Sequence, residues 1–169
     1  ETHRLMETVR RRYGLMVKVY FPDYAAVETY VKDHGTNGFF DSVELRQACC
    51  HIRKVEPLSR ALAGKRAWIT GMRRTQAATR TNLAVAERDA VHGLRKFNPL
   101  ANWSIDEVWA YIRRFDVPYS ALYDQGYASI GCAPCTRPIT AGEDIRAGRW
   151  WWEDPDSKEC GLHPRKDAL

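Results

Sequence analysis

The stretch AWITGMRRTQAATR, residues 67–80, combines the two signals that decide the fold. Its first part, residues 67–72, is a short apolar run of the length expected for a strand. Its second part is polar and carries Arg73 and Arg74 directly after the predicted strand. In α/β proteins, ligands bind at the loops that follow the strands of the sheet. The stretch therefore predicts a strand that brings arginines to a ligand site.

Helical patterns lie upstream of this stretch, with one more strand pattern between them. Apolar residues at helical spacing predict helices over residues 2–13, 23–35 and 41–62. Pro57 is expected to break or restart the last of these helices. The run LMVKVYF, residues 15–21, is apolar and β-branched, so we expect a buried strand there.

Downstream, a weaker strand pattern covers residues 94–97, and Ser104 with Glu107 forms a capping-box pattern at the start of another helix. The sequence then becomes irregular. Helices that alternate with short apolar strands predict an α/β layer structure with a mostly parallel sheet. We assign this domain to residues 1–145 and a C-terminal tail to residues 146–169.

The composition indicates a globular chain, and its modest positive charge fits either an anionic partner or ordinary surface charge. Its 169 residues are 44% hydrophobic, and the formal charge is +5. No apolar run approaches the roughly 18 residues of a membrane span, and no secretory signal is visible, so we expect no membrane partner. Five unevenly spaced cysteines do not match a secreted disulfide framework, which favours a cytoplasmic, reducing compartment. The chain opens on Glu1 and reads as a piece of a longer protein.

Four of the cysteines occur as two pairs. Cys132 and Cys135 form a C-x-x-C in a tight turn, a pattern that suits a metal, a cluster or a redox disulfide, although two unreactive cysteines would look the same. Cys49 and Cys50 are adjacent, so a disulfide between them would be strained. Together the pairs supply the four thiolates that a [4Fe–4S] cluster takes, and zinc is the alternative for the same set.

The fifth cysteine, Cys160, lies in a polar segment beside Gly161. Lys158 and His163 would favour its thiolate, whereas Glu159 would oppose it. From spacing alone, a nucleophile and a spare surface cysteine are equally good interpretations.

Five motifs in order carry a resemblance to a known family: CC, IRKVEPL, GMRRTQ, GCAPCTRP and ECGLH. Together they resemble the assimilatory adenylyl-sulfate (APS) reductases, the cluster-bearing branch of the sulfonucleotide reductases. The resemblance implies an adenine-nucleotide α-hydrolase-like, Rossmann-like fold. It also implies reduction of adenosine 5′-phosphosulfate to sulfite and AMP, in sulfate assimilation and cysteine biosynthesis.

The resemblance further implies a role for each cysteine. Cys160 would attack the substrate sulfur and form an S-sulfocysteine, from which thioredoxin or a glutaredoxin-like dithiol releases sulfite. The [4Fe–4S] cluster would be held by Cys49, Cys50, Cys132 and Cys135.

Attack of a thiolate on an anionic substrate requires nearby positive charge. Arginine suits this role because its planar guanidinium donates paired hydrogen bonds to phosphate and sulfate. Lys54 matches a family lysine between cluster and substrate, and His163 is expected to assist thiol exchange. The predicted substrate-binding set is Arg53, Lys54, Arg73, Arg74, Arg137, Arg146, Arg149 and His163.

The sequence departs from the family in one respect: the glycine- and serine-rich nucleotide loop and the strand that follows it are absent. We therefore expect low activity from these 169 residues alone. Two other functions compete with APS reduction. One is a reductase of the 3′-phosphorylated substrate (PAPS). The other is a zinc-stabilised, basic nucleic-acid-binding domain, although no second pair at finger spacing occurs, so we expect no nucleic-acid partner. An oligomer of identical chains is left open.

Overall fold

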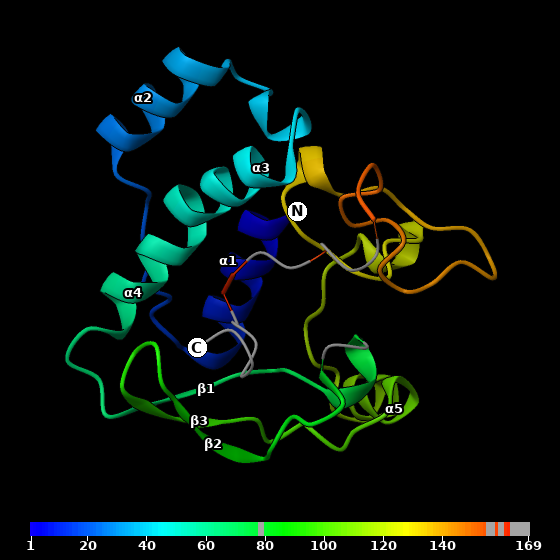
Figure 1. Cartoon of the computed structure of the whole chain (residues 1–169). Helices are drawn as coiled ribbons and strands as arrows, with labels where there is room; N and C mark the ends of the chain where they lie inside the picture. Colours follow the sequence, from blue (N-terminus) through cyan, green and yellow to red (C-terminus); the bar gives the residue numbers. More distant parts are fainter. Residues whose placement is uncertain (78–79, 155–157, 159–160, 163–169) are drawn as a thin grey trace. The chain divides into compact units, whose positions relative to one another are not determined.

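The computed structural model describes residues 1–77, 80–154, 158 and 161–162. Figure 1 shows the order of its elements along the chain. The chain divides into two compact units, and each is described by itself. The first contains Glu1–Lys18, Ala67–Asp89 and Arg95–Trp151, and is called the sheet unit here. The second contains Val19–Arg66, Ala90–Leu94 and the described part of Trp152–Leu169, and is called the helical unit.

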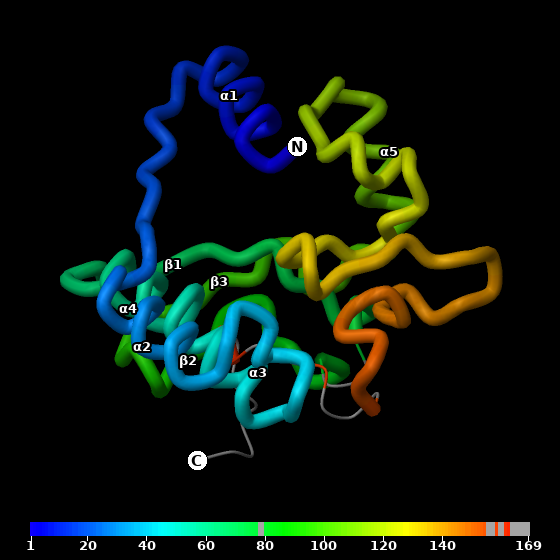
Figure 2. Tube along the Cα trace, turned by 90° about the horizontal axis from the view of Figure 1, so that it is seen from above, coloured from blue at the N-terminus to red at the C-terminus, as the bar shows by residue number. Residues whose placement is uncertain are grey.

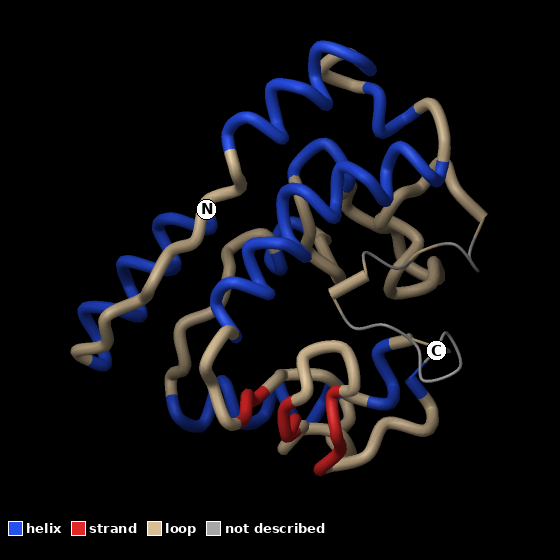
Figure 3. The backbone as a smooth tube through the Cα atoms, turned by 60° about the vertical axis from the view of Figure 1, so that its left-hand side comes forward, coloured by secondary structure: helices blue, strands red, loops and turns tan. Residues whose placement is uncertain are grey.

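The sheet has three short strands, coloured red in Figure 3, and their order is β1-β3-β2. β1 (Ala67–Ile69) pairs in parallel with β3 (Leu94–Phe97), with Trp68 opposite Lys96. β2 (Ala86–Asp89) is joined to β3 by a connection too short for a parallel crossover, so this second pair is antiparallel. The α/β expectation is confirmed, with one parallel and one antiparallel pair in the described sheet.

Hydrogen bonds satisfy the buried side chain of Asn98 beside the small apolar core of the sheet unit. Met72, Leu83 and Ala101 form a buried cluster. Asn98 is fully buried beside them; its side-chain amide donates to the carbonyl of Ala84 at 2.8 Å and its oxygen accepts from the hydroxyl of Thr70. Such satisfied buried groups fix the backbone geometry after β1 and β3, because leaving one unpaired would cost stability.

The predicted capping box is confirmed at the start of α5 (Ile105–Phe115). The hydroxyl of Ser104 accepts from the backbone N–H of Glu107 at 3.1 Å, and the Glu107 carboxylate accepts from the N–H of Ser104 at 2.7 Å. The hydrogen bond from the Ser104 N–H to the carboxylate is the main reason that the pKa of Glu107 lies below its ordinary value. α5 ends at Asp116 in the left-handed region, where the carboxylate pairs with Arg12 of α1 (Thr2–Tyr13) at 2.6 Å.

The helical unit is built on one nearly continuous run of helix. The first of its helices, α2 (Tyr24–His34), is capped by the Asp23 side chain. The long run then consists of α3 (Val43–Cys50), a π-helical turn η2 (His51–Val55) and α4 (Glu56–Leu62). Pro57 does not end the run, because it lies in the first turn of α4, where no N–H is needed from it.

Two strand predictions need correction. Residues 15–21 are not a buried strand: no strand is assigned there, and Met16 is 91% and Phe21 75% exposed. Figure 2 shows this segment as an extended link between α1 and α2. An apolar, β-branched run forms a strand only when a neighbouring strand pairs with it, and no such pairing is found within the described residues. The second correction is β2, whose sequence AERD is too charged to give a strand signal. Among the described helices, none has the length and hydropathy that a membrane span requires.

Candidate active-site elements around the two cysteine pairs

The adjacent cysteines end α3 in the helical unit. Ser42 caps the start of this helix by accepting from the N–H of Leu45 at 3.1 Å, so the helix is well defined up to the pair. Cys50 is buried and Cys49 half-buried, and neither forms a disulfide with a described residue. The pair thus presents one sulfur inside the unit and one at its surface.

Arg46 lies one helical turn before Cys50, on the same face of α3. Its guanidinium is fully buried and makes two parallel bonds to the Glu153 carboxylate: Nε to Oε1 at 2.8 Å and Nη2 to Oε2 at 2.7 Å. Only 3% of the Glu153 side chain is exposed. Burial alone would lower the pKa of Arg46, but the bonds to Glu153, with a contribution from the Cys50 sulfur, raise it above its ordinary value.

The residues next to Glu153 are held by aromatic packing. The Trp152 ring lies 4.4 Å from Phe40 and 6.4 Å from Phe39, in the 3-10 turn η1 (Gly38–Phe40). Further on, a methyl group placed on Gly161 would lie 3.5 Å from the side chain of Val55. Trp152 and Gly161, which precede and follow Cys160 in sequence, therefore both contact the helical unit.

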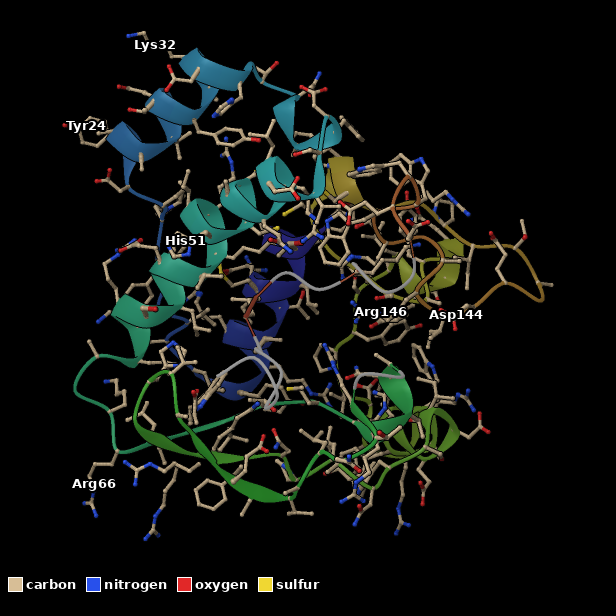
Figure 4. The ribbon with its side chains drawn as sticks, in the orientation of Figure 1. Tyr24, Lys32, His51, Arg66, Asp144 and Arg146 are labelled. Atoms are coloured by element: carbon tan, nitrogen blue, oxygen red, sulfur yellow. The ribbon has the colours of Figure 1, made fainter. Side chains whose placement is uncertain are left out.

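The π-helical turn η2 carries two of the predicted substrate-binding residues. Arg53 is exposed and Lys54 half-buried. His51, labelled in Figure 4, is also exposed at the start of this turn. Single π-helical turns inside α-helices occur frequently at functional sites, because they shift the side chains that follow. The distortion begins immediately after Cys50, which places Arg53 and Lys54 on a re-oriented turn beside the cysteine pair.

The C-x-x-C pair lies in the sheet unit, on the 3-10 turn η6 (Ala133–Cys135). The N–H of Cys135 donates to the carbonyl of Cys132 at 2.9 Å, and the Thr136 hydroxyl donates to the same carbonyl at 2.9 Å. The N–H of Gly131 in turn donates to the Thr136 hydroxyl at 3.1 Å. Cys135 is buried and Cys132 half-buried, so this pair also has one inner and one outer sulfur.

Arg149 and Trp150 pack directly on this turn. The N–H of Trp150 donates to the carbonyl of Cys135 at 3.1 Å, and Arg149 Nη1 donates to the carbonyl of Ile130 at 3.1 Å. The Arg149 guanidinium lies 4.4 Å from the centre of the Trp150 ring, which is fully buried. The Arg149 guanidinium lies so close to Gly131 that a side chain at position 131 would collide with it. Trp150 is thus a core residue, and Arg149 is a fixed cation beside the turn.

The arginines that follow β1 differ from each other. Arg74 is structural, since its Nε donates to the carbonyl of Leu83 at 2.8 Å and its Nη1 donates to Asn102. Arg73 is 8% exposed, and its Nε has no hydrogen-bond partner among the described residues. Burial lowers the pKa of Arg73. A buried guanidinium without a described carboxylate is a candidate ligand for an external anion.

The other predicted residues of the sheet unit, Arg137 and Arg146, lie in loops and contact nearby acidic residues. Arg137 pairs with Glu143 at 2.7 Å, and this pairing lowers the pKa of the Glu143 carboxyl to about 2. Arg146 is half-buried in a loop, where its backbone N–H donates to Asp144 at 2.8 Å; both are labelled in Figure 4. The predictions for Cys160 and His163 lie outside the described residues.

Sequence reasoning missed Arg46 and Glu153. An arginine four residues before a buried cysteine is a weak signal, because most helix arginines are exposed. A groove of about 420 Å³ in the sheet unit, lined by Trp109, Tyr123, Ile139 and Glu143, was also not predicted, and it contains none of the predicted site residues.

The donor chemistry of the cysteines fits a thiolate-bound metal centre pair by pair. None of the four forms a disulfide with a described residue, and thiolates are the usual ligands of iron–sulfur clusters. Within the part of the chain that the structure describes, no three His, Cys, Asp or Glu side chains lie close enough together to hold a metal ion. The two pairs belong to different units.

Comparisons with known proteins give consistent results. Residues 1–138 match the family model of the phosphoadenosine phosphosulfate reductase domain. The chain is 59% identical over 168 residues to an adenosine 5′-phosphosulfate reductase of Allochromatium vinosum, covering 99% of this chain and 66% of that protein. It is 56% identical over 163 residues to the protein of the same name from Burkholderia cepacia, covering 96% and 65%. The chain thus spans about two thirds of the length of these relatives.

A solved structure is also similar. It is the phosphoadenylyl-sulfate (PAPS) reductase of Candida auris, in a phosphate complex. The two share 35% sequence identity at a TM-score of 0.64, and the match covers 79% of this chain and 63% of the other.

Proposed function

Because this chain belongs to the phosphoadenosine phosphosulfate reductase domain family, we propose that it is the major part of a thiol-dependent adenosine 5′-phosphosulfate reductase. The observation that carries the proposal is the 59% identity over 168 residues to a protein of that name. The reaction would serve sulfate assimilation and cysteine biosynthesis. Four cysteines that form no disulfide among the described residues are consistent with a reducing, cytoplasmic compartment.

In the first proposed step, the Cys160 thiolate attacks the sulfur of the sulfate group of APS. A bond forms between the Cys160 sulfur and the substrate sulfur, while the bond from that sulfur to the bridging phosphate oxygen breaks. AMP leaves with the electron pair of the broken bond, and an S-sulfocysteine remains. Fixed positive charge near the leaving phosphate would stabilise the charge that develops there.

In the second step, a dithiol reductant, thioredoxin or a glutaredoxin-like protein, attacks the Cys160 sulfur. Sulfite leaves with the electron pair of the S–S bond, and a mixed disulfide forms. The second thiol of the reductant then displaces Cys160, so the reductant ends as a disulfide and Cys160 regains its thiol. The two electrons that reduce the substrate sulfur thus come from the dithiol. His163 is proposed to assist this exchange.

The described arginines support anion binding unequally. Arg73 is the best candidate, because it is a buried cation after β1 whose Nε has no described partner. Arg149 is held beside the C-x-x-C turn, and Arg53 and Lys54 lie on η2 beside Cys50. Arg74 and Arg137 already donate to groups of this chain, which makes them supports of the site rather than direct contacts.

We further propose that Cys49, Cys50, Cys132 and Cys135 hold a [4Fe–4S] cluster. When bound, it would supply iron–thiolate bonds to these four side chains. What supports this is the number and type of thiol donors and the single buried sulfur in each pair. Zinc on the same thiolates is the alternative that the chemistry of the ligands allows.

The test is anaerobic purification of the full-length protein, followed by metal analysis and a sulfite-release assay. Iron with acid-labile sulfide is expected, together with sulfite release from APS that exceeds release from PAPS. Stoichiometric zinc without iron would show that the cysteines hold zinc and not a cluster. Faster turnover of PAPS than of APS would show that PAPS is the substrate.

Cys160→Ser separates the nucleophile from the metal site. The variant should form no S-sulfo adduct when APS is added without reductant, and it should keep its iron content. An adduct that persists in the variant would show that another residue is the nucleophile. Binding of nucleic acid in place of turnover would favour the basic-domain alternative.

A further inference from the structure

We propose that Arg46 is a positioning residue, which uses its buried pairing with Glu153 to fix the start of the segment that carries Cys160 onto the helix that carries Cys49 and Cys50. The role of this pair in the reaction rests on the proposed function. The anchoring itself does not, because it follows from described contacts within the helical unit.

The geometry of the Arg46–Glu153 pair fixes both the distance between the two side chains and their relative orientation. Two parallel N–H···O bonds between planar groups restrain both the distance and the relative orientation of the guanidinium and the carboxylate. Both side chains are shielded from water, with 0% and 3% exposed, so solvent does not compete for these bonds. A buried pair of this kind is weak evidence for added stability, and its better-supported use is to specify one arrangement of the chain.

A second pair in the same unit shows what is special about Arg46. Arg60 and Glu56 of α4 also form two parallel bonds, at 2.6 and 2.9 Å. Their side chains are 46% and 37% exposed, and they are four residues apart on one helix. The bonds of that pair stay within one helix, and the further bond of Arg60 goes to the backbone carbonyl of Phe21, whereas the Arg46–Glu153 bonds join side chains 107 positions apart in sequence.

The anchor lies close to the proposed nucleophile along the chain. From Glu153 to Cys160 the backbone can extend at most about 25 Å. The Trp152 ring packs on Phe40 just before the anchor, and Gly161 lies beside Val55 just after Cys160. Both contacts are to the helical unit, so described residues that precede and follow Cys160 in sequence contact this unit. Loss of the Arg46 contact would widen the range of positions open to Cys160.

The experiment uses the full-length protein and three variants: Glu153→Gln, the double change Arg46→Met with Glu153→Met, and Glu56→Gln as the matched control. The first measurement is the rate of chymotryptic cleavage after Trp151 and Trp152. The second is the single-turnover rate of S-sulfo adduct formation on Cys160 with APS and no reductant, followed by peptide mass spectrometry. The third is the thermal midpoint.

Glu153→Gln should increase cleavage and slow adduct formation by about 10- to 100-fold, the cost typical of a misplaced reacting group. Glu56→Gln should leave both rates within about twofold, since exposed pairs contribute little. The double methionine variant removes both charges, so its thermal midpoint should be close to that of the wild type while adduct formation stays slow. That combination separates positioning from stability.

A double methionine variant with wild-type adduct formation would overturn the proposal, as would a Glu153→Gln variant with unchanged cleavage and adduct rates. If the wild-type protein forms no adduct, the proposed function fails and the role of Arg46 in the reaction fails with it. The cleavage rates then still decide whether Arg46 anchors the segment.

Discussion

Replacing Arg73 by methionine should stabilise the fold and weaken substrate binding at the same time. The guanidinium is 8% exposed, its Nε has no hydrogen-bond partner among the described residues, and burial lowers its pKa. Keeping this cation buried therefore costs free energy in the absence of an anion. Methionine has a similar length and no charge, so it removes that cost while it fills the same space.

The magnitudes follow from this environment. Exchange of an uncompensated buried charge for an apolar side chain should raise the free energy of unfolding by about 1–2 kcal/mol. For a chain of this size, that corresponds to a thermal midpoint about 2–8 °C higher. Loss of a charged hydrogen bond to the substrate should cost about 1.5–3 kcal/mol, or roughly a 10- to 150-fold higher KM for APS.

The neighbouring residue provides the control. Arg74→Met removes donors from the Leu83 carbonyl and from Asn102, so it should lower the free energy of unfolding by about 1–3 kcal/mol. Thermal midpoints are measured by scanning fluorimetry, and KM by sulfite release at varied APS. If Arg73→Met lowers the midpoint as Arg74→Met does, Arg73 is a satisfied structural residue, and the assignment of an anion to it is wrong.

Two further predictions concern local stability and pH. Ser104→Ala removes the acceptor for the Glu107 N–H, so it should cost about 1 kcal/mol of unfolding free energy in chemical denaturation, whereas Ser104→Asp, itself a good cap, should cost little. Equal losses in the two variants would contradict the capping box. Glu143 has its pKa lowered from 4.5 to about 2, chiefly by the hydrogen bond from Arg137. Because the folded-state pKa is the lower one, its stabilising effect is present above pH 4.5 and is lost as the pH falls toward 2. A carboxyl titration by NMR with a midpoint near 4.5 would show that the pair does not form in solution.

Local signals in the sequence were sufficient for the helices. Residues 2–13 and 23–35, and the capping box at Ser104, were predicted because helix ends depend on nearby residues and on spacing within one element. The strands were harder. The run 15–21 has the composition of a strand but no partner strand among the described residues, and β2 has a partner strand but a charged sequence. Strand formation depends on pairing with distant residues, which single-sequence patterns do not record.

The candidate site divides in the same way. The cysteine pairs and the arginine loop after β1 could be found because each is contiguous in sequence. Arg46 and Glu153 could not, since their pairing is a contact between residues 107 positions apart. The different roles of Arg73 and Arg74 were hidden for the same reason: which guanidinium meets the carbonyl of Leu83 depends on how the chain returns after the loop.

Arg46 and Arg73 show how burial and pairing together assign a role to an arginine. Both are buried, with 0% and 8% exposed, yet only Arg46 has a described carboxylate partner. When a carboxylate of the same chain neutralises a buried cation, the cation no longer attracts an external anion. Its contribution is then to fix the relative positions of the two segments that it joins. A buried cation that is not neutralised by described residues retains its charge for a ligand, and the fold bears the cost until the ligand binds. If this distinction holds, APS should raise the thermal midpoint of the wild-type protein more than that of Arg73→Met, and it should do so equally in wild type and Glu56→Gln.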